Sequence, residues 1–220
     1  KRFQTKNTGA EVVGILTANT VTAPKFCGDS DSNFIAGQSA GIAITDHSTS
    51  AVYNIFIGRE TAKKINTGCD NIIMGRNTFQ NATKACKNVI IGTRNALSFS
   101  GTDNPTSNVF LGHYVAQGMT GNCSNGVIIG SSTGRCGGVG GGGVLIGLNA
   151  GKGVLGRTHN SNVFIGNSAG FSVSTGGYNV AIGNAAGLCI CCGKNNVYLG
   201  LNAGYKQKRG GCNVAIGCGA

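Results

Sequence analysis

The chain has no tryptophan, only two prolines and few charged residues, with 7 acidic and 18 basic side chains among 220 residues. Charged residues make up 11 % of the chain, whereas about 25 % is usual in globular proteins. A disordered chain would carry more charge and fewer than the 40 % of apolar residues found here. No apolar run approaches the ~18 residues of a membrane-spanning helix. The sequence therefore argues against disorder and excludes membrane insertion through a helix.

Glycine is abundant instead, with 39 residues against a usual share of about 7 %. The composition argues against a helical bundle because glycine costs about 1 kcal/mol per helix position relative to alanine. Collagen is excluded because glycine does not recur at every third residue.

A repeat accounts for the glycine. Its clearest copies are Asn162–Gly170, Asn179–Gly187 and Asn196–Gly204, and weaker copies extend toward the N-terminus. The central glycines recur with a 17-residue period in six of the ten intervals, and the other four intervals are slightly longer. The eleven central glycines are Gly37, Gly58, Gly75, Gly92, Gly112, Gly130, Gly147, Gly166, Gly183, Gly200 and Gly217. Below, positions are counted from this glycine, so that position −1 directly precedes it.

Three apolar residues, largely β-branched or aromatic, precede each central glycine, as in Val89-Ile90-Ile91. Such residues favour strands. A half-exposed strand would alternate apolar and polar residues, so an uninterrupted triplet indicates that both faces are covered. We expect one face to point into the coil of its own chain and the other to meet a second surface, most simply another copy of the chain.

Asn occupies position −4 in nine repeats, and Gly126 and Gly143 replace it in the other two. Both residue types tolerate left-handed backbone, so this position is predicted to form a corner. Stacked asparagines can also form a ladder of side-chain amides. The central glycine is predicted to mark a second corner or a close approach of two backbones.

A 17-residue unit cannot bury its own apolar strip, but stacked units can. The sequence therefore predicts an all-β protein, a parallel β-solenoid or β-roll of about eleven 17-residue coils over residues 26–220. Residues 1–25 lack the repeat and are predicted to form a strand-like adaptor or cap. Because the sequence stops at Ala220 within a repeat, we expect a further segment beyond it. Two-sided and three-sided coils both fit the period, and a β-prism of antiparallel hairpins is the alternative architecture.

The unit Asn179-Val-Ala-Ile-Gly-Asn-Ala-Ala-Gly187 resembles repeats of bacteriophage tail fibres, which are often rich in cysteine as this chain is. It is also similar to the head repeat of trimeric autotransporter adhesins, whose units are shorter. The stretch Val13–Asp29 resembles a short segment that recurs in phage structural proteins. Both families imply a homotrimer that attaches to a cell surface. No binding residue carries over, because the matched motif is scaffold.

Ten cysteines are present, and two of them share a position in neighbouring repeats. Cys69 and Cys86 both stand at position −6 and are separated by one 17-residue period. Stacked coils would place their Cα atoms about 5 Å apart, within disulfide range. A disulfide and a pair of small buried thiols are both open interpretations. The stretch Cys189-Ile190-Cys191-Cys192 lacks the spacing of a zinc site, so no metal site and no cofactor is expected.

The charge is uneven. All seven acids lie at or before Asp103, whereas residues 104–220 hold seven basic residues and no acid. A basic surface attracts anionic partners such as lipopolysaccharide, nucleic acid or sulfated glycans. If the chain binds a surface, the residues that depart from the repeat are the candidates: Lys63-Lys64, Ser98–Thr106, and Lys206, Lys208 and Arg209. Ordinary polar turns explain them equally well.

Apparent catalytic motifs are parts of the repeat. Gly-x-Ser-x-Gly occurs around Ser39 and Ser168, but other copies place Asn at the serine position, and a nucleophile elbow needs a strand–turn–helix context. A glycan hydrolase would need two carboxylates about 5–10 Å apart, for which Asp29 with Asp31 and Asp46 with Glu60 are the nearest candidates. Threonines near one position suggest an ice-binding array as a further alternative: Thr61, Thr78, Thr93 and Thr133.

The sequence thus predicts a non-enzymatic structural fibre segment of a phage tail or similar extracellular appendage that supports host-cell attachment. The expected partners are further copies of the chain, as a homotrimer or filament, and an anionic cell surface or glycan. The expected location is a virion tail fibre or the cell surface. A bacterial adhesin or self-assembling filament is the alternative, followed by a glycan hydrolase on a solenoid.

Overall fold

The computed structural model describes residues 32–44, 50–99, 103–119, 123–135, 138–140, 142–154 and 158–220. The predicted adaptor, residues 1–25, lies outside this part of the chain. The described residues form strands, bridges and turns, and no helix occurs among them.

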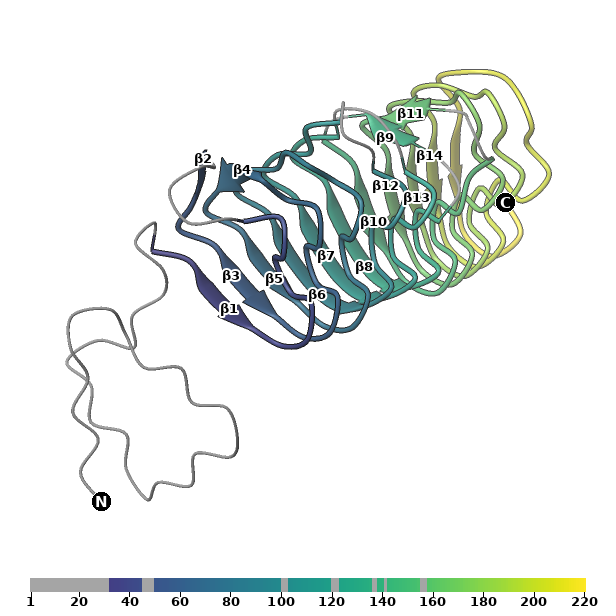
Figure 1. Ribbon diagram of the computed structural model, residues 1–220. Coiled ribbons are helices and arrows are strands. Elements are labelled where there is room, and N and C mark those ends of the chain that lie inside the picture. Colours follow the sequence, from purple (N-terminus) through teal and green to yellow (C-terminus); the bar gives the residue numbers. More distant parts are fainter. Residues whose placement is uncertain are drawn as a thin grey trace, which may run out of the picture.

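The protein is an all-β parallel solenoid whose coils follow one another along a rod (Figure 1). Each of the eleven repeats contributes its apolar triplet as one strand of an 11-stranded sheet. Every strand pair is parallel and in register, as in Ile72 opposite Val89, so the antiparallel β-prism alternative is wrong for the described residues. The strands of this sheet are β1 (Phe34–Ala36), β3 (Ile55–Ile57), β5 (Ile72–Met74), β6 (Val89–Thr93), β7 (Val109–His113), β8 (Val127–Ser131), β10 (Val144–Ile146), β12 (Val163–Ile165), β13 (Val180–Ile182), β14 (Val197–Leu199) and β15 (Val214–Ile216).

A second row of pairing runs along the coils at and before position −6, and it is discontinuous. It contains β2 (Ser50–Val52) paired with β4 (Thr67–Cys69), and β9 (Gly138–Gly140) paired with β11 (Thr158–Asn160). Elsewhere single bridges continue it, such as Cys86 with Thr106. This row is irregular because the number of residues that precede it differs between repeats. The spacing between the triplet and its glycine, in contrast, is the same in every repeat.

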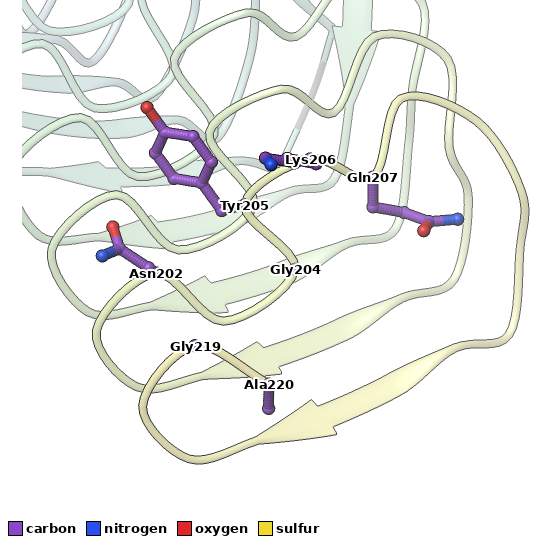
Figure 2. A pocket seen from close by; sticks show the side chains of 7 residues that line it. All are labelled: Asn202, Gly204, Tyr205, Lys206, Gln207, Gly219 and Ala220. Atoms are coloured by element: carbon purple, nitrogen blue, oxygen red, sulfur yellow. The ribbon is translucent and has the colours of Figure 1, made fainter.

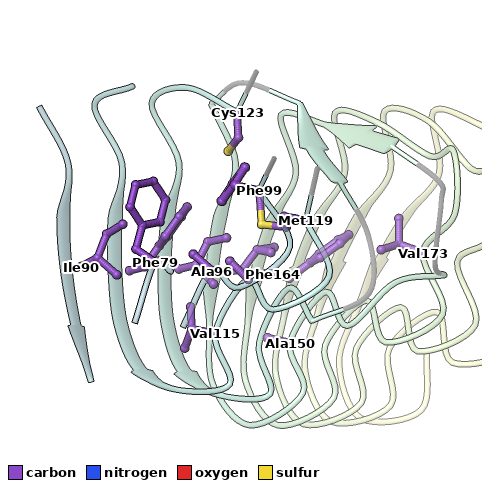
Figure 3. Packing of buried hydrophobic residues seen from close by; sticks show 14 of the residues in the cluster. Phe79, Ile90, Ala96, Phe99, Val115, Met119, Cys123, Ala150, Phe164 and Val173 are labelled. Atoms are coloured by element: carbon purple, nitrogen blue, oxygen red, sulfur yellow. The ribbon is translucent and has the colours of Figure 1, made fainter. Parts of the chain in front are cut away.

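The middle residue of each triplet points into the coil. At this position Phe56, Ile73 and Phe110 are fully buried. Position +7 supplies the facing side chains, among them Phe99 and Met119 (Figure 3). Where position +7 is the small Ala82, Phe79 at position +4 fills the space and packs edge-on against Phe99, with ring centroids 5.7 Å apart. The two outer residues of each triplet therefore face away from the core, because successive side chains of a strand point to opposite faces.

The corner before the sheet lies one residue earlier than predicted. Position −5 has positive φ in all eleven repeats, for example 59° at Tyr53 and 61° at Lys87, whereas the asparagines at position −4 do not. Seven residue types occur at position −5: Ser, Tyr, Asp, Lys, Asn, Cys and Gly. No residue type marks this corner, so the sequence did not reveal it.

The asparagines form the buried amide ladder that the sequence suggested. Asn71 Nδ2 donates to Asn54 Oδ1 at 2.8 Å and to the Ala85 carbonyl of the next coil at 2.8 Å. Its own Oδ1 accepts from the backbone N–H of Asn88 at 3.1 Å and from Asn88 Nδ2 at 3.0 Å. The side chain is fully buried, yet all its polar atoms are paired, so burial costs little.

The ladder is interrupted where Gly126 replaces asparagine. There Asn108 Oδ1 accepts from the Gly126 N–H at 2.9 Å, and the buried thiol of Cys123 donates to the same oxygen at 3.4 Å. Cys123 thus supplies the side-chain donor that the missing asparagine would have provided.

The central glycines lie where neighbouring coils touch. All eleven have φ between 123° and 141°, a region that side chains rarely allow. At Gly147 an added Cβ would lie 2.5 Å from the carbonyl oxygen of Gly166 and 2.8 Å from its carbonyl carbon. The glycines of successive coils are thus in backbone contact, and positions +2 and +4, which also have positive φ in most coils, carry the chain around the next turn.

Candidate functional surfaces

The largest candidate surface is the outward side of the 11-stranded sheet, which we call the outer apolar face. It consists of positions −3 and −1 of every repeat, and each of these positions holds an apolar residue in all eleven copies. Ile72 is 37 % exposed, Ile182 39 % and Ile91 40 %. Position −3 holds Phe34, Ile55, Ile72, Val89, Val109, Val127, Val144, Val163, Val180, Val197 and Val214. Position −1 holds Ala36, Ile57, Met74, Ile91, Leu111, Ile129, Ile146, Ile165, Ile182, Leu199 and Ile216.

This face is unusual for a parallel sheet. Parallel sheets occur almost only where both faces are covered, and apolar patches above a few hundred Å² are rare on monomers. The inner face is covered by the coil itself, whereas the outer apolar face is open in the described chain.

A basic edge lies in the N-terminal part of the described rod, and the sequence reasoning missed it. Arg59 and Arg76 are exposed and follow the central glycines of neighbouring coils. Arg94 Nη1 donates to Tyr114 Oη at 2.5 Å, and the Arg135 guanidinium lies 5.4 Å from the Tyr114 ring centroid. We call Arg59, Arg76, Arg94 and Arg135 the arginine edge. Its four members come from four different repeats. Arg59 and Arg76 share position +1 in neighbouring coils, and stacking of the coils brings Arg94 and Arg135 to the same tyrosine ring.

The three predicted basic residues do not form one site. Lys206 lines an open hollow of about 520 Å³ together with Tyr205 and Gln207 (Figure 2). Gly219 and Ala220 of the last coil form its opposite wall, so this hollow belongs to the end of the stack. Lys208 and Arg209 are exposed on another part of the same loop, above the cysteine pair of the preceding coil.

The other loop candidates are only partly described. Lys64 is exposed and Lys63 half-buried. Within the stretch 98–106, Phe99 is a core residue, Asp103 is nearly buried, and residues 100–102 lie outside the described chain.

Cys69 and Cys86 meet across two coils, with Sγ atoms 3.1 Å apart and the backbone N–H of Cys69 donating to Cys86 Sγ at 3.2 Å. Both thiols are free in the structure. The hydrogen bond with Cys86 and partial burial raise the pKa of the Cys69 thiol to about 12. The pair is placed for a disulfide between coils, which stays a prediction.

The Gly-x-Ser-x-Gly serines occupy the left-handed turn at position +2, with φ of 57° at Ser39 and 56° at Ser168. The Ser168 hydroxyl donates to its neighbour Asn167 Oδ1 at 2.8 Å. Glu60 Oε2 accepts from Gln80 Nε2 at 2.7 Å, whereas Asp29, Asp31 and Asp46 lie outside the described residues.

Three of the four ice-binding candidates are not at the surface. Thr61, Thr78 and Thr133 are fully buried, and each hydroxyl bonds the central glycine's carbonyl in the next coil, at 2.7 Å for Thr78. A threonine array on the surface is therefore wrong.

Two further searches cover the described residues only. No cluster of three or more His, Cys, Asp and Glu side chains that could hold a metal ion occurs in them. None of the described segments forms a helix of the length and apolarity that crossing a membrane requires. Comparison of the whole chain with protein-family models, with curated proteins and with solved structures found no match.

Proposed function

We propose that this chain is a structural segment of a fibre, in a phage tail or a similar extracellular appendage, which supports attachment to a host cell. The observation that carries the proposal is the outer apolar face, to which every repeat adds two apolar side chains and no charge along the whole rod. A second copy of the chain has a matching face of the same length.

The face offers apolar surface along the whole described rod. Six of its members are exposed, namely Ile55, Ile72, Ile91, Ile182, Val214 and Ile216, and the others are half-buried. Association through the face would remove this remaining apolar surface from water, which stabilises a complex.

A closed trimer uses the two sides of the face differently. Position −3 is mainly Val and position −1 mainly Ile or Leu. When position −3 of one copy packs against position −1 of the next, the contact is heterologous, and a ring of three satisfies each copy. The same contact without closure gives an open filament, which is the alternative assembly for an adhesin or self-assembling fibre.

The experiment is sedimentation equilibrium of the chain at micromolar concentration. We expect a trimer, which becomes a monomer with an unchanged far-UV spectrum in the double variant Ile91→Glu/Ile182→Glu. Lys64→Glu, an exposed change elsewhere on the rod, is the matched control and should remain trimeric. A monomeric wild-type chain would contradict association through this face, and long filaments would favour the alternative assembly.

The arginine edge supports attachment to an anionic surface, because Arg59, Arg76 and Arg94 are exposed and the guanidinium groups of Arg94 and Arg135 lie against the same tyrosine ring. We expect Arg76→Gln/Arg94→Gln to weaken retention on a dextran sulfate surface at low salt. Lys206→Gln/Lys208→Gln tests the loop that the sequence indicated. Full retention by both variants would argue against attachment through either basic region.

A further inference from the structure

A second pair of cysteines lies on the surface near the C-terminal end of the described rod. Cys191 and Cys192 are adjacent in sequence, and their Sγ atoms are 3.1 Å apart. Cys192 is exposed and Cys191 half-buried, and neither is in a disulfide. Two thiols bound to one tetrahedral zinc ion would be about 3.8 Å apart, given Zn–S bonds of about 2.3 Å. The pair therefore fits thiol chemistry better than a zinc site.

The stacking of coils gives this pair a specific environment. Thr175, Cys192 and Arg209 all stand at position +9, in three successive repeats. The backbone N–H groups of Cys191 and Cys192 both donate to the Lys208 carbonyl, at 3.0 and 3.2 Å. These bonds fix the pair between the coil that carries Thr175 and the coil that carries Arg209.

The pKa values of the two thiols are shifted in opposite directions, although the Arg209 charge lowers both. The Thr175 hydroxyl, then the Cys191 thiol, the Thr175 N–H and the Arg209 charge lower the pKa of Cys192. The hydrogen bond to Cys192 raises the pKa of Cys191. Cys192 is also the more exposed of the two thiols, so an external disulfide reaches its sulfur first, and a lower pKa favours the thiolate form that attacks.

We propose that Cys191 and Cys192 form a reactive dithiol that reduces exposed disulfides of small molecules or proteins, with Cys192 as the attacking sulfur and Cys191 as the resolving one. In the first step the Cys192 thiolate attacks a disulfide R–S–S–R′, forms Cys192–S–S–R and releases R′–S⁻. In the second step Cys191 loses its proton to solvent and attacks Cys192 Sγ, which releases R–S⁻ and closes a Cys191–Cys192 disulfide. Two thiols are oxidised and one disulfide is reduced, so no other oxidant is needed.

The chain contains a matched control in Cys69, whose partner thiol is at the same distance of 3.1 Å. An increase of one unit in the pKa of a thiol lowers its thiolate fraction tenfold and raises the nucleophilicity of the thiolate about threefold. The reaction rate therefore falls about threefold per unit. Since the Cys69 pKa is raised from 9.0 to about 12, we expect it to react about thirty-fold more slowly than an ordinary thiol. Brief alkylation with iodoacetamide, followed by peptide mass spectrometry, should modify Cys192 faster than Cys69 by at least this factor.

The two-step reaction is tested with an aromatic disulfide, dithiobis(nitrobenzoate), in a background in which the cysteines outside the pair are replaced by serine. We expect release of two thionitrobenzoate ions per Cys191–Cys192 pair, with no adduct left on that peptide. Cys191→Ser should release one ion rapidly and retain the adduct on Cys192, whereas Cys192→Ser should lose the fast phase. Thr175→Val should slow the first release while leaving the circular dichroism spectrum unchanged.

Two results would overturn the proposal: alkylation of Cys192 no faster than of Cys69, or a stable adduct on the chain with both cysteines present. Neither result bears on the assembly of the fibre, because the outer apolar face does not include these residues.

Discussion

Two central glycines allow the cost of backbone strain to be measured separately from the cost of steric contact. Gly147 lies against the next coil, whereas no described residue lies against Gly217. Gly147 and Gly217 have similar φ angles, 132° and 123°. An added Cβ at Gly147 would meet the Gly166 carbonyl oxygen at 2.5 Å, whereas at Gly217 nothing lies within 4 Å. The pair Gly147→Ala and Gly217→Ala therefore measures the contact alone.

The magnitude follows from the two terms. A non-glycine residue in this region of φ costs about 1–3 kcal/mol, which both variants share. At Gly147 the next coil must also move by at least about half an ångström against its sheet hydrogen bonds, and such overpacking costs about 1–3 kcal/mol more. We expect Gly147→Ala to lower the free energy of unfolding by about 4 kcal/mol and Gly217→Ala to lower it by about 2 kcal/mol.

Thermal unfolding followed by far-UV circular dichroism at one protein concentration is the assay. In a chain of this size a change of about 1 kcal/mol in the free energy of unfolding shifts the midpoint of thermal unfolding by about 2–4 °C. The midpoints of the two variants should therefore differ by about 4–8 °C. Equal midpoints would refute the reasoning, because they would show that backbone contact between coils contributes nothing to the need for glycine.

Three further predictions concern the asparagine ladder and the cysteines. Asn88→Ala should lower the free energy of unfolding by about 3–4 kcal/mol, because it leaves several buried donors and acceptors unpaired. Asn213→Ala, at the end of the ladder, should lower it by less than about 1 kcal/mol. Equal midpoints of urea unfolding for the two variants would contradict a stabilising role of the ladder. Burial raises the pKa of Cys123 from 9.0 to about 12, so the thiol ionises first in the unfolded chain, and its stabilising effect is complete below pH 9 and declines between pH 9 and 12. When free energies of unfolding from denaturant curves at pH 8 and 10 are compared, the loss on going to pH 10 should be about 1.4 kcal/mol smaller in Cys123→Ala than in the wild-type chain. Air oxidation should join Cys69 to Cys86, and non-reducing peptide mapping that pairs either with another cysteine would disprove this link.

The repeat determined most of the fold. Identical spacing of triplet, asparagine and glycine has one simple solution, in which equal positions stack, so the parallel solenoid and the amide ladder could be read from the chain. The corner was placed one residue late because the sequence shows residue preference, and Asn54 is preferred for its ladder bonds rather than for its φ. The left-handed residue is its neighbour Tyr53, which no preference marks.

The candidate surfaces divide in the same way. The sequence alone established that three apolar residues per coil exceed what one buried face needs, and that cysteines recur one period apart. Only the tertiary structure decided that the middle residue of each triplet is inside and its two neighbours outside, because the direction of a strand's side chains is set by its pairing and not by its composition. Stacking also placed Arg94 and Arg135 beside Tyr114, and Cys192 between Thr175 and Arg209. These contacts join residues that are at least one full repeat apart in the chain, and a local motif cannot contain them.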